Sequence, residues 1–225
     1  MAAYSPAPMR RLLALAALTL ATAAAPQAPA PGIVRVRLHT SAGPIIVALE
    51  SARAPRTTAN FLQYVDDGRF DGVTFYRAAR KKIDPRYGFV QAGIRTDARR
   101  ILRTSVPMER TDVTGIRHLD ATISMARGTD PDSAAGNFVI TVGGSPNLDA
   151  AGGYPGYAAF GRVIAGMDVV KRILALPTGG GSGVMRGQMI LKPVALVRAE
   201  RLDGRARPSG RVKPWLLALP KVEAR

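Results

Sequence analysis

The 225-residue sequence can form one domain or two small ones, and its 47% content of hydrophobic residues can supply a core. A formal charge of +16, from 32 Lys and Arg against 16 Asp and Glu, favours anionic partners but does not determine the fold. The absence of cysteine excludes disulfides, thiolate metal sites and a cysteine nucleophile. The two histidines, His39 and His118, lie in no metal-binding or catalytic motif, so we expect chemistry without a metal or a covalent nucleophile.

The first thirty residues, 1–30, are predicted to be a secretory signal and a Pro/Ala-rich segment. Arg10 and Arg11 precede an apolar run, 12–25, that contains only Leu, Ala and Thr, and small residues and prolines follow it. The run is short for a membrane anchor, and it lacks the polar face of a buried helix. We therefore expect a protein that is secreted from the cytoplasm, into the periplasm if the source is Gram-negative.

The next expected elements are a β-hairpin and a helix. Residues 33–38 alternate between apolar and polar, and the apolar stretch 45–49 follows the turn signal Ala42-Gly43-Pro44. Apolar residues then repeat at helical spacing from Ala59 onward, and Asp67-Gly68 ends that pattern. The preceding Pro55-Arg56-Thr57-Thr58 offers an N-cap for the helix.

Short apolar runs dominate the rest of the globular part. They lie at 73–76, 89–91, 121–126, 138–142 and 158–163, and Gly, Pro, Asn and Asp separate them. Strands at this spacing, without helical patterns between them, indicate an antiparallel sandwich or barrel. A second helix is predicted at 167–176, closed by Pro177, and a last strand at 192–197.

Three further segments lack the features of a binding motif. The Gly-rich run 179–183 has no Gly-Lys-Ser/Thr after it and is interpreted as a flexible loop. Asp130-Pro-Asp132 lacks the central Gly and the closing Glu of a calcium loop and is interpreted as a turn. The basic tail, 199–225, contains an apolar island at 215–219; we expect it to be strapped onto the barrel, with a membrane-surface or partner contact as the alternative.

Several motifs, in order, resemble the cyclophilin family of peptidyl-prolyl cis-trans isomerases, and particularly its secreted bacterial branch. They are Phe75-Tyr-Arg77, Gln91-Ala-Gly93, Ala121-Thr-Ile-Ser-Met-Ala-Arg127, Asp132-Ser-Ala-Ala-Gly-Asn-Phe-Val-Ile140, Asn147-Leu-Asp149 and Gly156-Tyr-Ala-Ala-Phe-Gly-Arg-Val163, followed by Gly166-Met-Asp-Val. The resemblance covers about 33–197. It implies a mainly β fold, a closed antiparallel eight-stranded β-barrel capped by two α-helices, within a domain over 31–198.

The family's reaction suits a chain without catalytic histidine or cysteine motifs. Isomerising an X-Pro bond means breaking its partial double-bond character, at a barrier of ~18–20 kcal/mol. An apolar slot for proline and a donor to the twisted prolyl nitrogen lower that barrier without a metal or a cofactor. The resemblance assigns Arg77 as this donor and Gln91 as the residue that orients it. It assigns substrate contacts to Phe75, Phe89, Met125, Arg127, Asn137, Val139, Leu148 and Tyr157.

The sequence also departs from the family pattern around the pocket. A longer and basic link, containing Arg80 to Arg86, separates Arg77 from Gln91, and it places Gly88 and Phe89 at two pocket-lining positions. One apolar wall is therefore expected to be lost or displaced. Val139 stands where the family usually has Phe, a difference of ~1–3 kcal/mol in apolar burial.

Two functional hypotheses remain open at this point. The first is an isomerase that assists the folding of secreted or envelope proteins and binds proline-containing polypeptides. The alternative is a catalytically weak cyclophilin-like peptide-binding module or chaperone, which the pocket departures favour. The basic cluster 80–103 offers a weak contact with an anionic envelope surface; nucleic acid is not expected as a partner of a secreted protein, and a monomer is expected.

Overall fold

The computed structural model describes residues 1, 30–95, 97–102 and 105–216. Its strands are β1 (Ile33–Thr40), β2 (Gly43–Glu50), β3 (Val73–Arg80), β4 (Gly88–Gly93), β5 (Thr122–Met125), β6 (Asn137–Val142), β7 (Ala159–Ala165), β8 (Thr178–Gly179) and β9 (Met189–Arg201). Its helices are α1 (Pro55–Asp66), α2 (Thr111–Thr114) and α3 (Met167–Leu174), with short 3-10 turns η1 (Ala98–Arg100), η2 (Pro146–Leu148), η3 (Gly183–Met185) and η4 (Pro214–Leu216). The predicted signal segment lies outside the described residues, apart from its first and last positions.

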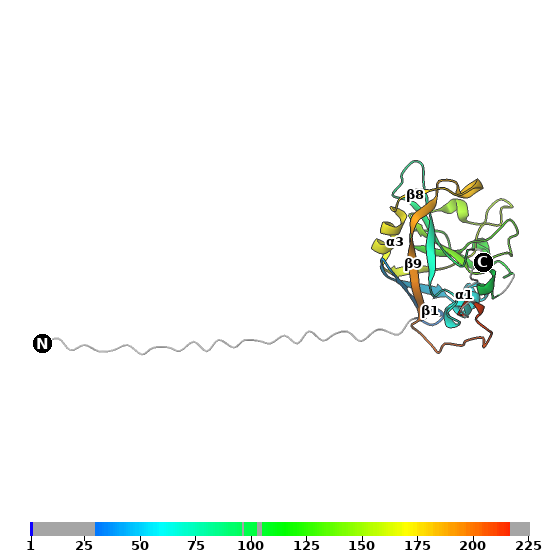
Figure 1. The fold of residues 1–225 in the computed structure, drawn as a ribbon, viewed down its shortest axis with the longest axis horizontal. Helices are drawn as coiled ribbons and strands as arrows, with labels where there is room; N and C mark the ends of the chain where they lie inside the picture. Colours follow the sequence, from blue (N-terminus) through cyan, green and yellow to red (C-terminus); the bar gives the residue numbers. More distant parts are fainter. Residues whose placement is uncertain (2–29, 96, 103–104, 217–225) are drawn as a thin grey trace, which may run out of the picture.

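The strands close into a barrel in the order β1-β2-β7-β5-β6-β4-β3-β9, and pairing of β9 with β1 completes the ring (Figure 1). Every pairing among the described strands is antiparallel. The two-residue strand β8 adds to β9 outside this ring. The structure thus confirms the closed eight-stranded antiparallel barrel, because each strand of the ring pairs with a neighbour on both sides.

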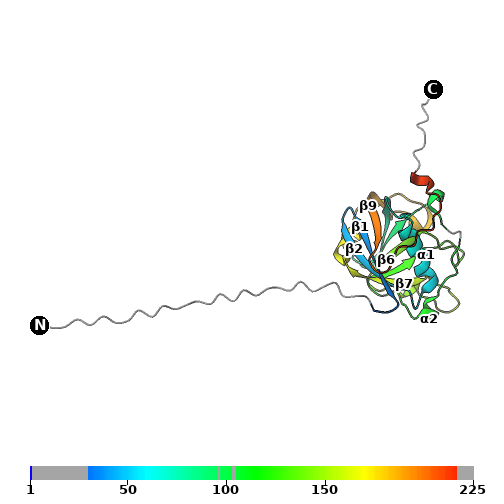
Figure 2. The ribbon, with the colours of Figure 1, turned by 90° about the horizontal axis from the view of Figure 1, so that it is seen from below.

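Two helices with apolar faces, α1 and α3, cover the barrel on opposite sides in Figure 1, as predicted. The α1 face buries Phe61 among Phe70, Phe138 and Phe160, with ring centroids 5.0 to 5.4 Å from that of Phe61. Such tilted and edge-on aromatic contacts add to apolar burial. The single-turn helix α2 was not predicted; it lies beside α1 in Figure 2.

The N-terminus of α1 is capped differently from the prediction. Ala54 occupies the N-cap position without a side-chain hydrogen bond, and Pro55 opens the helix. The carboxylate of Glu109 instead accepts hydrogen bonds from the backbone N–H groups of Arg56 (2.9 Å) and Thr57 (2.8 Å). A carboxylate also suits the positive end of the helix dipole. The predicted cap from Pro55-Arg56-Thr57-Thr58 is therefore wrong, because a residue far along the chain accepts from the first turn.

The described part of the tail, up to Leu216, runs back along α1. Strand β9 continues to Arg201, past the predicted end of the domain at 198. Beyond it, Ser209 donates from its backbone (2.6 Å) and hydroxyl (2.7 Å) to Asp67 at the end of α1. The ring centroid of Trp215 lies 4.8 Å from the guanidinium carbon of Arg69 and 5.3 Å from that of Arg100. Through these contacts the described part of the tail is held against the barrel domain, as a strap.

Several arginines of the basic cluster 80–103 have structural partners. The Arg80 guanidinium donates to the carbonyl oxygens of Leu174 and Leu176 at the end of α3. Arg86 and Arg99 pair with Asp84 (2.7 Å) and Asp97 (2.9 Å). Within the described residues, no helix is both long and apolar enough to cross a membrane.

Candidate active site

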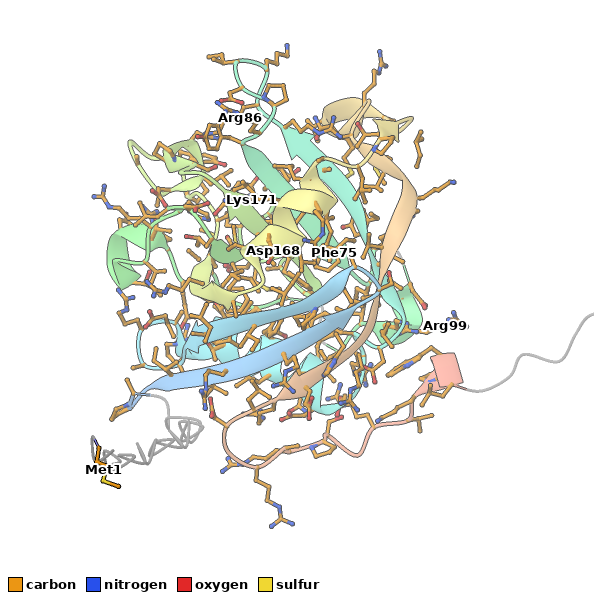
Figure 3. The ribbon with its side chains drawn as sticks, turned by 90° about the vertical axis from the view of Figure 1, so that its left-hand side faces the viewer. Met1, Phe75, Arg86, Arg99, Asp168 and Lys171 are labelled. Carbon is orange, nitrogen blue, oxygen red and sulfur yellow. The ribbon has the colours of Figure 1, made fainter. Side chains whose placement is uncertain are left out.

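A β-bulge in β3 sets the direction of Arg77. Phe75 pairs with Ala92 and Arg77 pairs with Gln91, so Tyr76 is an extra residue in the register. Regular alternation would place residues 75 and 77 on the same face of the sheet. The bulge breaks this alternation. Phe75, labelled in Figure 3, is fully buried inside the barrel and packs edge-on against Phe138, whereas Arg77 is only half-buried. The structure therefore contradicts the predicted substrate contact of Phe75, which belongs to the core.

The guanidinium of Arg77 donates to three neutral acceptors. Its Nη1 lies 3.0 Å from Oε1 of Gln91, its Nε lies 2.9 Å from Oε1 of Gln188, and its Nη2 lies 3.3 Å from the carbonyl oxygen of Val184. No carboxylate of the described residues forms an ion pair with it. Burial lowers the pKa of Arg77, yet arginine stays protonated at any physiological pH. The site thus holds a positive charge that no neighbouring negative charge offsets.

Arg77 lies at the edge of a cavity of about 310 Å³. The cavity is lined by Arg77, Phe89, Gln91, Met125, Ala126, Arg127, Val139, Leu148, Tyr157, Val184 and Met185. All the predicted site residues apart from Phe75 and Asn137 are in this set. The arrangement is an apolar slot with a cation and an amide at one side, which suits a ligand with an apolar ring and a polar backbone.

The sequence matches the family model of the cyclophilin type peptidyl-prolyl cis-trans isomerases over residues 35–200. The chain belongs to this family. It is 36% identical over 170 residues to the peptidyl-prolyl cis-trans isomerase cyp18 of Streptomyces antibioticus. The aligned region covers 74% of this chain and 98% of that relative. It is 35% identical over 170 residues to peptidyl-prolyl cis-trans isomerase A of Dickeya dadantii, covering 75% and 86%.

A solved structure shares the fold. The cyclophilin-type isomerase of Cryptosporidium parvum, crystallised in the presence of the dipeptide Ala-Pro, superposes with a TM-score of 0.60 and 17% identity over 76% of this chain and 99% of its own. The present cyclophilin is accordingly a peptidyl-prolyl cis-trans isomerase.

The basic insertion lengthens the β3–β4 hairpin, and its loop residues, 81–87, do not line the cavity. Arg80 pairs with Gly88, and a backbone bond from Lys81 to Tyr87 (2.9 Å) closes the loop, whose outer residue Arg86 is labelled in Figure 3. Gly88 has φ +147° and a Cβ there would meet the carbonyl oxygen of Ala79 at 2.0 Å, so this position cannot carry a lining side chain. Tyr87 instead lies over Gly143, outside the cavity.

The apolar wall is displaced and rebuilt from two segments. Phe89 faces the cavity, and its ring lies 5.1 Å from the guanidinium carbon of Arg77. Val184 and Met185 of η3 supply further apolar lining. The composition of the Gly-rich segment before them predicts a flexible loop, and nothing in it predicts that this part of the chain reaches the site. Only the long-range pairing of β9 with β3 brings it there.

Asn137 does not line the cavity. It belongs to a neighbouring hollow of about 300 Å³, where its side-chain oxygen accepts hydrogen bonds from the Tyr76 hydroxyl (3.1 Å) and the Arg95 backbone (2.8 Å). Burial raises the pKa of Tyr76 to about 12, so the phenol keeps its proton and this bond. This hollow adjoins the cavity and shares Gln91 and Arg127 with it, so the predicted substrate contact of Asn137 stays a prediction.

A buried network supports two walls of the cavity. Nδ1 of His118 lies 2.6 Å from Asp149, and its Nε2 lies 2.9 Å from the hydroxyl of Ser124. The geometry resembles a catalytic triad, but Ser124 is fully buried and no substrate reaches it. The network instead joins Asp149, next to Leu148, to Ser124, next to Met125. Burial lowers the pKa of His118 against the opposing effect of Asp149, which favours the neutral imidazole.

Proposed function

We propose that this cyclophilin isomerises X-Pro bonds in the cavity of Arg77, with Arg77 as the catalytic donor and Gln91 as its orienting partner. The observation that carries the assignment is the cross-strand pair of Arg77 and Gln91, with its 3.0 Å hydrogen bond, at the edge of an apolar cavity. The proline ring would enter between Phe89, Met125, Val139 and Leu148.

The chemistry follows from the loss of amide resonance. When the X-Pro bond twists, the lone pair of the prolyl nitrogen localises and becomes a hydrogen-bond acceptor. A guanidinium has five N–H groups, and the three bonds to Gln91, Gln188 and Val184 leave two for the substrate. A donor fixed in a partly dehydrated site stabilises this nitrogen more in the twisted state than in the planar one. No proton, nucleophile or metal ion takes part in this step.

The remaining predicted residues hold the substrate chain. The side chain of Arg127 donates to the carbonyl oxygen of Gly156 (2.9 Å) and lies 4.7 Å from the ring of Tyr157. The guanidinium of Arg127 is thus bonded within the protein. We therefore assign the backbone of Arg127, and not its side chain, to the binding of an extended peptide. We assign Tyr157 and Leu148 to the wall that the peptide lies against.

We further propose that the clients are polypeptides outside the cytoplasm. The support is the N-terminal pattern of two arginines, an apolar run and small residues. Expression of the full-length chain in a Gram-negative host tests this, by cell fractionation and N-terminal sequencing of the product. A processed N-terminus in the periplasmic fraction is expected, and an intact Met1 in the cytoplasmic fraction would contradict the proposal.

One experiment tests catalysis against the alternative of a peptide-binding module, which the small Val139 at the cavity wall favours. A protease-coupled assay with an Ala-Pro peptide measures the isomerisation rate, and calorimetry measures binding of the same peptide. We expect a rate well above the uncatalysed one. Binding of the peptide without any acceleration would establish the binding module instead.

A further inference from the structure

We propose that Gln188 is a positioning residue that fixes the guanidinium of Arg77, a proposal that rests on the catalytic role assigned to Arg77 above. Gln188 lies outside the motifs by which the chain resembles its family, immediately before β9. Its Oε1 accepts a hydrogen bond of 2.9 Å from Nε of Arg77, the shortest of the three bonds to that side chain.

The two glutamines hold Arg77 from opposite sides. Arg77 stands on β3, which lies between β4 and β9 in the barrel. Gln91 binds Nη1 from β4, and Gln188 binds Nε from the start of β9. The third bond, from Nη2 to the carbonyl oxygen of Val184, is the longest at 3.3 Å, so without Gln188 the guanidinium is held closely at Nη1 alone and can pivot about that bond. The second bond therefore determines where the free N–H groups point, which is the quantity that matters for a donor.

The backbone around Gln188 is itself tied to β3. Its carbonyl oxygen accepts from the N–H of Ala78 (2.9 Å), and its N–H donates to the carbonyl oxygen of Met185 (3.0 Å). Gly181, at φ +77°, passes so close to Met185 that a Cβ would lie 2.5 Å from that carbonyl oxygen. The Gly-rich segment is thus a closely folded turn before Gln188, and the close approach requires glycine at position 181.

The neutral side chain of Gln188 suits this role. A carboxylate at the same place would fix the guanidinium equally well, but it would offset the positive charge that the prolyl nitrogen meets. Both side chains that accept from Arg77 are glutamines. The site thereby combines fixed geometry with an undiminished charge.

The test uses two variants of the full-length chain, Gln188→Ala and Gln188→Met. Methionine keeps the length of the side chain and removes the acceptor, so it separates the hydrogen bond from packing. We expect kcat for an Ala-Pro peptide to fall about tenfold in both variants, with Kd within about twofold of the wild-type value. The NMR signal of the Arg77 Nε–H group should exchange faster with water in both. Gln63→Met, on α1 away from the cavity, is the matched control and should behave as the wild type.

Three results would overturn the inference: wild-type kcat in Gln188→Met, an unchanged kcat with weakened peptide binding, or unchanged exchange of the Arg77 Nε–H group. Arg77→Ala is measured alongside. If Arg77→Ala is inactive and Gln188→Met is fully active, the positioning role alone fails. If Arg77→Ala keeps the wild-type rate, the proposed role of Arg77 fails as well.

Discussion

Val139 determines how much apolar surface the cavity offers to a proline ring. It lies on β6 opposite Gln91 and lines the cavity with a smaller side chain than the Phe that the resemblance leads one to expect. The Val139→Phe variant should bind an Ala-Pro peptide about fivefold more tightly, since about 1 kcal/mol of apolar contact is gained. Calorimetry on the folded variant checks this, and unchanged or weaker affinity would show that a larger side chain at position 139 gains no contact with the ligand.

His118 makes stability depend on pH. Its pKa is lowered by burial in the folded chain, so the unfolded chain binds more protons as the pH falls below the ordinary histidine value of about 6.5. Stability should therefore decrease as the pH falls from about 6.5 through the folded pKa. Urea unfolding at pH 7.5 and 5.5 measures this for the wild type and for His118→Asn, which cannot titrate. The variant should be less stable at pH 7.5 by about 1–2 kcal/mol and should lose less on acidification. Equal losses in both proteins would contradict the assignment.

At the scale of elements, α1 depends on a carboxylate from another part of the chain. Glu109 accepts from two backbone N–H groups of the first turn, those of Arg56 and Thr57. Glu109→Ala should lower the free energy of unfolding by about 1–2 kcal/mol, and Glu109→Gln, which keeps an acceptor without the charge, by less. Thermal and urea unfolding provide the measurement. Wild-type stability of Glu109→Gln would mean that the charge contributes nothing at this helix end, and equal losses in the two variants would mean that a neutral acceptor cannot replace the carboxylate.

The hairpin β3–β4 shows why the apolar runs predict strands that are too short. The apolar runs predicted short strands at 73–76 and 89–91, whereas the strands span Val73–Arg80 and Gly88–Gly93. Cross-strand pairing extends them through polar residues such as Arg80, whose side chain donates to α3. The alternation of side chains cannot reveal such an extension, because the register is set by partners elsewhere in the barrel.

On the scale of the whole molecule, local patterns predicted the parts whose causes are local. Alternation, helical spacing and turn residues identified the hairpin β1–β2, the helices α1 and α3, and the β-rich middle. The bulge at Tyr76, the cap from Glu109 and the approach of Gln188 to Arg77 escaped prediction, since each joins residues far apart in the sequence or depends on register. Most residues that the motifs single out line one cavity, but the motifs could not show that Phe75 turns inward or that η3 supplies a wall.

The contact between the tail and the carboxylate of Asp67 should depend on pH. Burial would raise the pKa of Asp67, but the hydrogen bonds from Ser209 and Arg69 outweigh it and lower the pKa below its usual value. The ionised carboxylate thus favours docking above the unfolded pKa of about 3.9, and this contribution is lost as the pH falls through the folded pKa. Trp215 is the single tryptophan of the sequence and reports the docked tail.

We therefore expect the tryptophan emission to shift to the red as the pH falls below about 4, and to be red-shifted already at neutral pH in Asp67→Asn. Asp84→Asn, in the distant β3–β4 loop, is the control and should leave the emission unchanged at neutral pH. Circular dichroism at each pH separates release of the tail from unfolding of the barrel. A wild-type spectrum in Asp67→Asn would show that this carboxylate does not hold the tail.

The central claim is that the Arg77 guanidinium stabilises the twisted prolyl bond. The most direct measurement is the isomerisation rate of an Ala-Pro peptide by Arg77→Ala beside the wild type, together with the Kd of the peptide for both. The account predicts a fall in kcat of about a hundredfold, with Kd changed by no more than a few-fold, because the interaction is made mainly in the twisted state. A variant that folds, binds the peptide and keeps the wild-type rate would contradict it.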